Sequence, residues 1–149
     1  MTNTRITDAE VFERRYPVIL REFSIREGSG GIGAHPGGDG VIRDIEFRIP
    51  VQVSILSERR VYQPYGMAGG GDAACGLNLW IRGHEKRSIN LGGKNTAAMK
   101  PGERIVIYTP GGGGYGEASE GRKVKNVRDP RHAWRGGSLA SRIATQESN

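Results

Sequence analysis

The stretch that decides the fold is Thr109-Pro110-Gly111-Gly112-Gly113-Gly114-Tyr115-Gly116, which directly follows the apolar run Ile105-Val106-Ile107-Tyr108. Four consecutive glycines permit positive φ angles, close approach of another chain segment, or amide N–H groups presented to an anion. Three of the glycines also match the G-x-G-x-x-G spacing after an expected strand. Residues 117–123 are polar and non-periodic, however, and a dinucleotide-binding motif needs an amphipathic helix there. We therefore predict a tight turn that ends a β domain.

Glycine also separates the other apolar runs of the chain. The sequence has 24 glycines in 149 residues, about twice the usual share of roughly 7%. They cluster at 28–40, 69–71 and 111–114, which favours many short strands over long helices. The segment 28–40, which contains His35 and Asp39, is a long loop, and loops of this length in a compact domain are usually functional or lie against a partner.

The apolar runs between the glycines alternate with a period of two, which is typical of half-buried strands. We expect 41–47 and 51–56 to form two antiparallel strands with Pro50 marking the turn or a strand start, and Trp80 to lie on the less apolar face of its strand. Thr7 and Glu10 match a capping box, which predicts a helix from about residue 8 to 15. Strands are expected within 18–26, 41–47, 51–56, 77–82, 88–91 and 105–108.

These elements predict a fold that is mainly β: a Gly-rich antiparallel β domain of six or seven short strands, sandwich- or barrel-like, with one short N-terminal helix. Residues 1–118 form this β segment, and 119–149 form a basic, largely flexible tail. The tail carries most of the net charge of +6, because seven Lys and Arg residues after position 121 face only two acidic residues. No aromatic-interleaved pattern accompanies the basic residues, which argues against a nucleic-acid groove.

Composition also limits the cellular compartment and the kinds of catalytic or metal site that we expect. A single cysteine, Cys75, allows no intramolecular disulfide and suits a reducing compartment. No apolar run approaches 18 residues and the N-terminus has no secretory h-region, so we expect no membrane association. His35, His84 and His132 lie far apart without ligand spacing, which predicts no metal site. No general acid–base pair stands out among the carboxylates.

Arg59 and Arg60 are the clearest candidates for binding, because they stand close to the Gly-rich turn around 66–71. Two guanidinium groups there would suit a carboxylate or a phosphate held bidentately. The alternative is a solvated strand end with no ligand.

Nine ordered blocks of the sequence are similar to one enzyme family. Together they resemble the C-terminal part of ATP-dependent 5-oxoprolinase, within the hydantoinase B half of the hydantoinase/oxoprolinase family. The resemblance covers about four-fifths of the chain and fades after Glu117. The blocks are Met1–Asp8, Arg14–Val18, Arg21–Phe23, Gly28–Gly31, Gly37–Val41, Glu58–Arg60, Gln63–Gly66, Asn90–Lys94 and Thr109–Gly116.

The resemblance implies ATP-coupled hydrolysis of the lactam of 5-oxo-L-proline to L-glutamate, a cytosolic step of glutathione turnover in the γ-glutamyl cycle. It implies ATP, Mg²⁺ and K⁺ for the full-length enzyme. The family handles nucleotide in the hydantoinase A half, so we expect this segment to bind no cofactor and to be inactive alone. The implied partners are the hydantoinase A and upstream hydantoinase B regions, with a possible homodimer of the full enzyme. Met1 aligns with an internal methionine of the family, which suggests a truncated gene copy or a split gene model.

The same resemblance selects residues expected to face substrate or the rest of the enzyme, without assigning a catalytic residue or a metal ligand. These are Asn3, Thr4, Arg5, Arg59, Arg60, Tyr65, Gly111, Gly112, Gly113 and Gly114. Two alternatives remain open: a stand-alone β module that binds an anion or a protein, and a subunit of a related hydantoinase or acetone-carboxylase-type enzyme.

Overall fold

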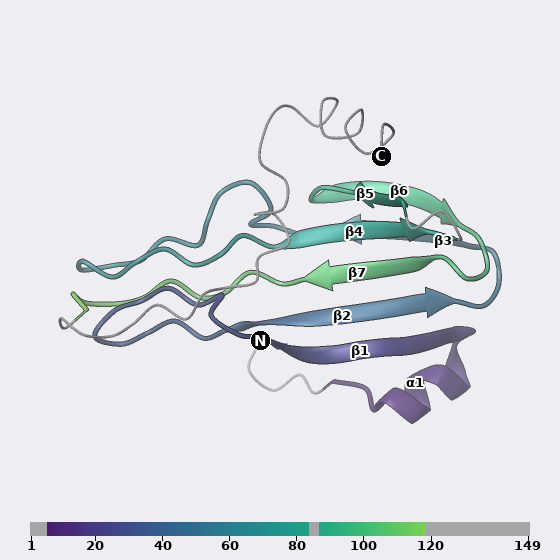
Figure 1. Cartoon of the computed structure of the whole chain (residues 1–149), viewed down its shortest axis with the longest axis horizontal. Coiled ribbons are helices and arrows are strands. Elements are labelled where there is room, and N and C mark those ends of the chain that lie inside the picture. The colour runs from purple at the N-terminus through teal and green to yellow at the C-terminus, as the bar shows by residue number, and fades with distance from the viewer. Residues whose placement is uncertain (1–5, 84–86, 119–149) are drawn as a thin grey trace.

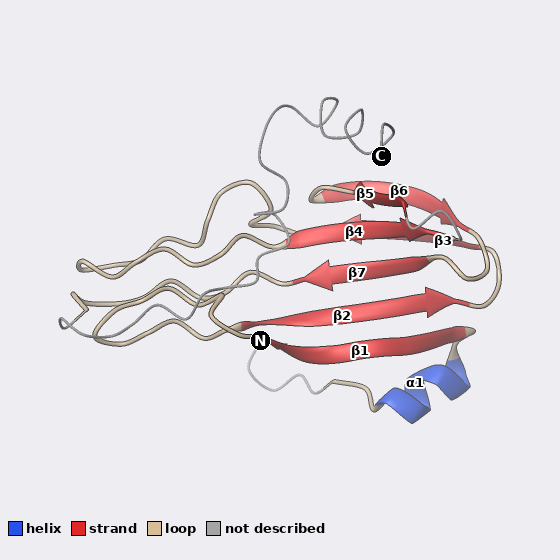
Figure 2. Cartoon of the chain, viewed as in Figure 1, coloured by secondary structure: helices blue, strands red, loops and turns tan. Residues whose placement is uncertain are grey.

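The computed structural model describes residues 6–83 and 87–118, which form seven strands and one helix. Figure 2 shows that the chain is mainly β, as predicted. The two sheets are not closed into a barrel. The basic tail lies outside the described residues. The elements are α1 (Ala9–Arg15), β1 (Val18–Arg26), β2 (Gly40–Phe47), β3 (Val51–Leu56), β4 (Leu77–Arg82), β5 (Arg87–Asn90), β6 (Lys94–Met99) and β7 (Arg104–Tyr108).

Helix α1 is capped at its N-terminus by Asp8, not by the Thr7 of the predicted capping box. The Asp8 carboxylate accepts hydrogen bonds from the amides of Glu10 (3.0 Å) and Val11 (3.4 Å). An aspartate is at least as good an N-cap as a threonine and its charge also suits the positive end of the helix. The helix ends at Tyr16, whose backbone is already extended before Pro17.

No helix in the described part of the chain has the length and apolar character needed to span a membrane.

The strands form a five-stranded antiparallel sheet in the order β1-β2-β7-β4-β5 and a separate two-stranded sheet of β3 and β6 (Figure 1). The two antiparallel strands at 41–47 and 51–56 are present, but they do not pair with each other. Both edges of β2 are taken by β1 and β7. The Arg48 amide donates to the Pro17 carbonyl and so extends the pairing of β2 with β1. Pro50 has no N–H for a hairpin ladder between β2 and β3.

Strand β6 is absent from the sequence-based expectation, because its sequence Lys-Asn-Thr-Ala-Ala-Met has low β propensity. It forms as the partner of β3, with Val51 opposite Met99 and Leu56 opposite Lys94. Ala97 and Met99 are buried in the core while their neighbours are exposed. Burial against the larger sheet therefore outweighs the intrinsic preference of the segment.

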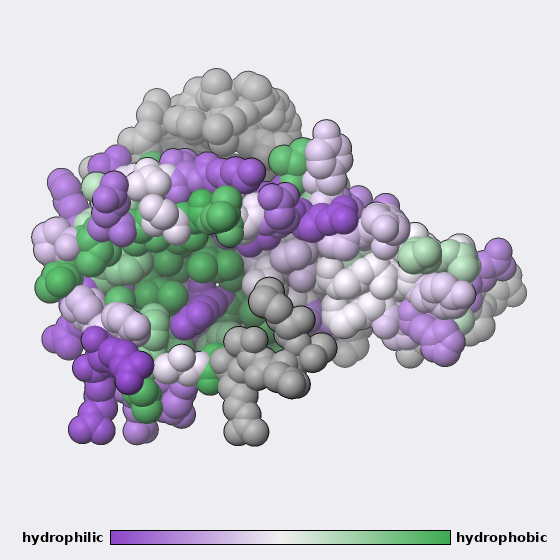
Figure 3. Space-filling model, turned by 180° about the vertical axis from the view of Figure 1, so that it is seen from behind, coloured by the Kyte–Doolittle hydropathy of each residue, from purple (hydrophilic) through white to green (hydrophobic). Residues whose placement is uncertain are grey.

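The principal core lies between the two sheets. The predicted inward residues of β3 pack against it, and so does Trp80, whose indole Nε1 donates to Glu103 Oε2 at 3.1 Å. The predicted division of the two faces of β4 is confirmed, because Leu77, Leu79 and Ile81 lie together in a smaller cluster with Val106. The sequence does not show that the other face, which carries Trp80, packs against the principal core. The buried members of the principal core are Val18, Ile45, Phe47, Leu91, Ala97, Met99 and Ile105. Figure 3 shows hydrophobic side chains also gathered on the rear surface of the sheet region, framed by hydrophilic ones.

The glycine-rich segments 28–39, 65–74 and 109–116 run side by side and form an arm that projects from one end of the sheets (Figure 1). We call these three segments the glycine arm. Backbone hydrogen bonds join them, including Gly31 N–H to Gly112 O (2.8 Å), Gly112 N–H to Gly38 O (2.9 Å) and Gly114 N–H to Gly71 O (2.9 Å). The long loop 28–40 thus lies against two other segments of the same chain.

The run Gly111–Gly114 is not the tight turn that the sequence predicts. It continues extended beyond β7, and none of its four residues has a positive φ. A Cβ atom at Gly111, Gly113 or Gly114 would overlap a carbonyl oxygen of a neighbouring arm segment. Glycine is therefore required at these positions for close backbone approach and not for left-handed geometry.

Two buried polar side chains fasten the glycine arm to the sheet. Arg26, which is 3% exposed, donates from Nη1 to the carbonyls of Cys75 (2.8 Å) and Thr109 (3.0 Å). Ser29 donates to the Arg26 carbonyl (2.7 Å) and accepts from the Gly40 amide (2.7 Å). These bonds join β1 to the starts of β2 and β4 and to the end of β7.

Candidate functional site

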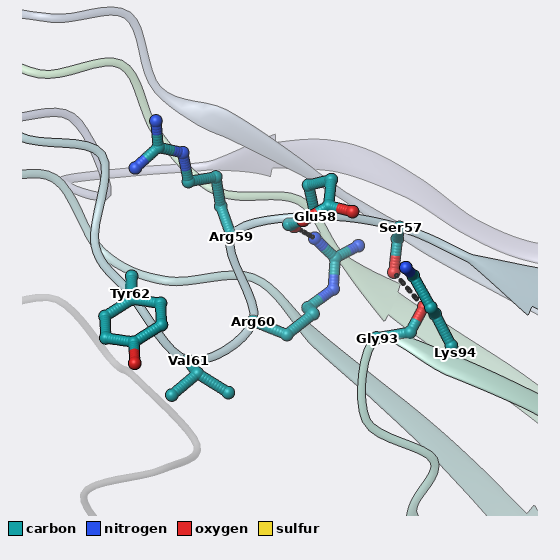
Figure 4. Close-up of a pocket in the computed structure, with 8 residues that line it drawn as sticks. All are labelled: Ser57, Glu58, Arg59, Arg60, Val61, Tyr62, Gly93 and Lys94. Atoms are coloured by element: carbon teal, nitrogen blue, oxygen red, sulfur yellow. Dashed lines mark hydrogen bonds between the residues drawn. The ribbon is translucent and has the colours of Figure 1, made fainter.

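The candidate site is a surface pocket of about 690 Å³ between the loop after β3 and the start of β6 (Figure 4). Its lining has three cationic side chains and one carboxylate, so the pocket is positively charged. The lining residues are Ser57, Glu58, Arg59, Arg60, Val61, Tyr62, Gly93 and Lys94.

A buried amide holds the floor of this pocket in place. Ser57 donates from its amide (2.8 Å) and its hydroxyl (3.1 Å) to the Gly93 carbonyl. The buried Asn78 donates from Nδ2 to Ser57 Oγ (2.9 Å) and to the Gly92 carbonyl (2.8 Å). Because these bonds connect the two segments directly and through β4, the loop after β3 and the turn before β6 are held at a fixed separation.

Arg60 forms one wall of the pocket and is half-buried. Its Nη1 donates to the Glu58 carbonyl (2.6 Å) and its Nη2 to Asn78 Oδ1 (3.2 Å). Burial lowers the pKa of Arg60, and the positive charge of Arg26 lowers it further. A Cβ at Gly76 would collide with the Arg60 guanidinium, so a glycine there leaves the space that the side chain fills.

Arg59 points away from Arg60, as Figure 4 shows. Its backbone is left-handed, with φ 57°, and its Nη1 donates to the Gln63 carbonyl at 3.3 Å. The guanidinium carbon lies 5.7 Å from the centroid of the Tyr65 ring, a cation–π distance. The two arginines are therefore not placed to hold one anion between them, although both line the same pocket.

The predicted glycine candidates lie in the glycine arm, away from this pocket. The amides of Gly111, Gly112 and Gly114 donate to the carbonyls of Ala74, Gly38 and Gly71. These three N–H groups are therefore already used within the chain. The candidates Asn3, Thr4 and Arg5 lie outside the described residues.

Sequence reasoning missed Ser57, Tyr62 and Lys94. Lys94 follows a Gly-Gly pair, but only the pairing of Leu56 with Lys94 places it beside Arg60. Across the described residues 6–83 and 87–118, no group of three or more His, Cys, Asp or Glu side chains is placed to hold a metal ion. Cys75 is buried, and its thiol donates to the Val61 carbonyl at 3.4 Å.

Asp44 lies on the opposite face of the larger sheet from the principal core and gives a pH-dependent prediction. It is 7% exposed, and its Oδ2 accepts from Arg104 Nη1 at 2.7 Å. Burial raises the pKa of Asp44 above its ordinary value of 3.8, and Arg104 opposes this rise. The folded state therefore binds this proton more tightly than the unfolded state, so ionisation of Asp44 lowers stability as pH rises through and above 3.8.

Asp44→Asn removes that ionisation. We expect the free energy of unfolding of the variant to become larger relative to that of the natural chain as pH rises from about 3 to about 7, because only the natural chain loses stability when Asp44 ionises. Urea unfolding of both chains at several pH values measures this difference. The contributions of the other titrating groups are the same in both chains and cancel in the difference. A difference that stays constant, or that falls as pH rises, would contradict the raised pKa.

The fold and the site together define a glycine-rich antiparallel β segment with a cationic pocket. The chain belongs to the hydantoinase B/oxoprolinase family, whose family model matches residues 1–118. The resemblance of the nine sequence blocks is thereby confirmed.

Three comparisons place the chain among its relatives. It is 60% identical to an uncharacterised protein of Schizosaccharomyces pombe, over 100% of this chain and 12% of the relative. It is 62% identical to the 5-oxoprolinase of Saccharomyces cerevisiae, over 72% of this chain and 8% of that protein. The crystal structure of the ATP-dependent caprolactamase from Pseudomonas jessenii superposes with a TM-score of 0.65 at 27% identity, covering 74% of this chain and 20% of that one. The chain thus spans 8–12% of the length of these two curated relatives.

Proposed function

We propose that this chain is the β segment of a 5-oxoprolinase-like amidohydrolase, which couples ATP hydrolysis to opening of the 5-oxo-L-proline lactam to L-glutamate in cytosolic glutathione turnover. The observation that carries the proposal is the 62% identity to the Saccharomyces cerevisiae 5-oxoprolinase. The structural neighbour supports it, because that protein is an ATP-dependent caprolactamase, an enzyme named for a lactam.

In this proposal the segment contributes structure and contact surface, and the remainder of the enzyme holds ATP, Mg²⁺ and K⁺. The length of the relatives leaves room for that remainder, because this chain spans only 8–12% of the two curated relatives. The proposed partners are the hydantoinase A and upstream hydantoinase B regions, within an enzyme that we propose to be a homodimer.

A chimaera tests the proposal. The full 149-residue chain replaces the matching segment of the Saccharomyces cerevisiae 5-oxoprolinase, and 5-oxoproline-dependent ATP hydrolysis and glutamate release are measured. We expect activity within about tenfold of the natural yeast enzyme. A tenfold loss corresponds to a rise of about 1.4 kcal/mol in the activation free energy, which would reflect small errors in the position of the replaced segment. The isolated chain should show no turnover.

Caprolactam serves as the competing substrate in the same assay. The higher identity to 5-oxoprolinase predicts a preference for 5-oxoproline. A folded chimaera that hydrolyses ATP with caprolactam but not with 5-oxoproline would overturn the substrate assignment, and turnover by the isolated chain would overturn the division of roles. Light scattering of the chimaera measures the proposed dimer.

A further inference from the structure

We propose that the rim of the cationic pocket is a docking surface for one segment of the remainder of the enzyme, a segment that carries a carboxylate next to aliphatic side chains. This inference rests on the proposed function for the identity of the partner. It assigns Val61, Tyr62 and Lys94 to an interface that joins the β segment to the enzyme body.

The apolar part of this surface is the most exposed in the described chain. Leu56, Val61 and Tyr62 are 81%, 80% and 80% exposed, more than any other large hydrophobic side chain among the described residues. All three belong to the end of β3 and the loop that follows it. Large apolar side chains gathered at one place on a surface mark interaction sites.

The polar part of the surface has the charge of a carboxylate receptor. Arg59, Arg60 and Lys94 line the pocket together with a single carboxylate, that of Glu58. Arg60 Nε is buried and has no hydrogen-bond partner among the described residues. Because Nε is enclosed, the exposed Arg59 and Lys94 are the cations that an arriving carboxylate reaches.

The combination of the two parts selects a protein segment as the occupant. A small anion such as glutamate would neutralise the cations but leave Val61 and Tyr62 in water. A segment with Asp or Glu beside Leu, Val or Phe satisfies both, and interfaces commonly surround an apolar centre with a polar rim. The relatives supply such a partner, because this chain spans only 8–12% of their length.

The loop that carries this surface has a fixed base, and the amides at its tip are not hydrogen-bonded within the described chain. Four hydrogen bonds among Ser57, Asn78, Gly92 and Gly93 fix the base of the loop. The amides of 58–62 donate to no described residue. These amides should therefore exchange rapidly in the isolated chain, which makes them a direct reporter of a docked partner.

Hydrogen exchange of the amides of 58–62 tests the inference, in the isolated 149-residue chain and in the yeast chimaera. We expect exchange at least about tenfold slower in the chimaera. The double variant Lys94→Glu with Tyr62→Ala should restore rapid exchange there. Lys100→Glu is the matched control, because Lys100 is an exposed lysine directly after the opposite end of β6, and it should leave exchange slow.

Equal exchange in the isolated chain and in the chimaera would overturn the docking surface, whether or not the chimaera is active. An inactive chimaera that still protects these amides would contradict the proposed function alone. Slowed exchange in the isolated chain on addition of 5-oxoproline or glutamate, with none in the chimaera without them, would assign the pocket to a small anion and overturn the protein partner.

Discussion

Replacing Gly37 with alanine is expected to destabilise the fold strongly, whereas the same substitution at Gly38 leaves its stability nearly unchanged. A Cβ at Gly37 would overlap the Gly112 carbonyl, while a Cβ at Gly38 would meet nothing within 4 Å. Neither glycine has a positive φ, so backbone preference does not separate the two variants. The pair therefore isolates close backbone approach as the reason for glycine.

The size of the Gly37→Ala effect follows from the displacement of the segment around Gly112 that the added Cβ would force. Forcing extra volume into a packed region costs roughly 1–3 kcal/mol. Separating the segments would also weaken the bonds Gly37 N–H to Gly31 O and Gly112 N–H to Gly38 O, at about 1 kcal/mol each. We expect a loss on the order of 3–5 kcal/mol for Gly37→Ala, and for Gly38→Ala a change within about 0.5 kcal/mol.

Urea unfolding followed by circular dichroism measures both variants, and amide exchange at Gly31 and Gly112 shows whether the glycine arm opens before the sheets unfold. Gly113→Ala and Gly112→Ala form a second pair. A Cβ at Gly113 would overlap the Tyr65 carbonyl, and one at Gly112 would lie 3.4 Å from its nearest neighbour. Equal stability within each pair would refute the close-approach explanation.

The strands and the glycine arm differ in how much of them the sequence can predict. Strands 51–56 and 77–82 have the predicted bounds, because alternating side chains record which face is buried. The glycines of the arm have no side chains whose pattern could show which segment lies beside them. Which glycine segments lie side by side depends on which strands they continue from. The order of those strands is a property of the whole sheet.

The candidate site likewise has one part that the sequence predicts and one part that depends on strand pairing. Arg59 and Arg60 are adjacent in the sequence, and their paired charge is enough to mark them as candidates for binding. Lys94 and Ser57 join them only through the β3–β6 pairing. The β6 sequence has low strand propensity, so neither the strand nor its register could be predicted. A pocket built across two distant segments is visible only once their pairing is known.

Replacing Arg26 with methionine is expected to loosen the junction between the sheet and the glycine arm. Methionine keeps much of the apolar stem but leaves the carbonyls of Cys75 and Thr109 without their donor. Hydrogen bonds to charged groups contribute roughly 1.5–3 kcal/mol each. The loss should therefore be on the order of 3–6 kcal/mol, a large fraction of the roughly 5–15 kcal/mol that stabilises a typical domain.

Arg21→Met on the same strand is the matched control. Arg21 is exposed and its pair with Glu46 (2.8 Å) lies on the surface, where ion pairs contribute little. Urea unfolding should therefore leave Arg21→Met close to the natural chain. Arg26→Lys should fall between the natural chain and Arg26→Met, because one ammonium does not reproduce the planar geometry of a guanidinium. If Arg26→Met and Arg21→Met were equally stable, the buried arginine would not be what holds the glycine arm to the sheet.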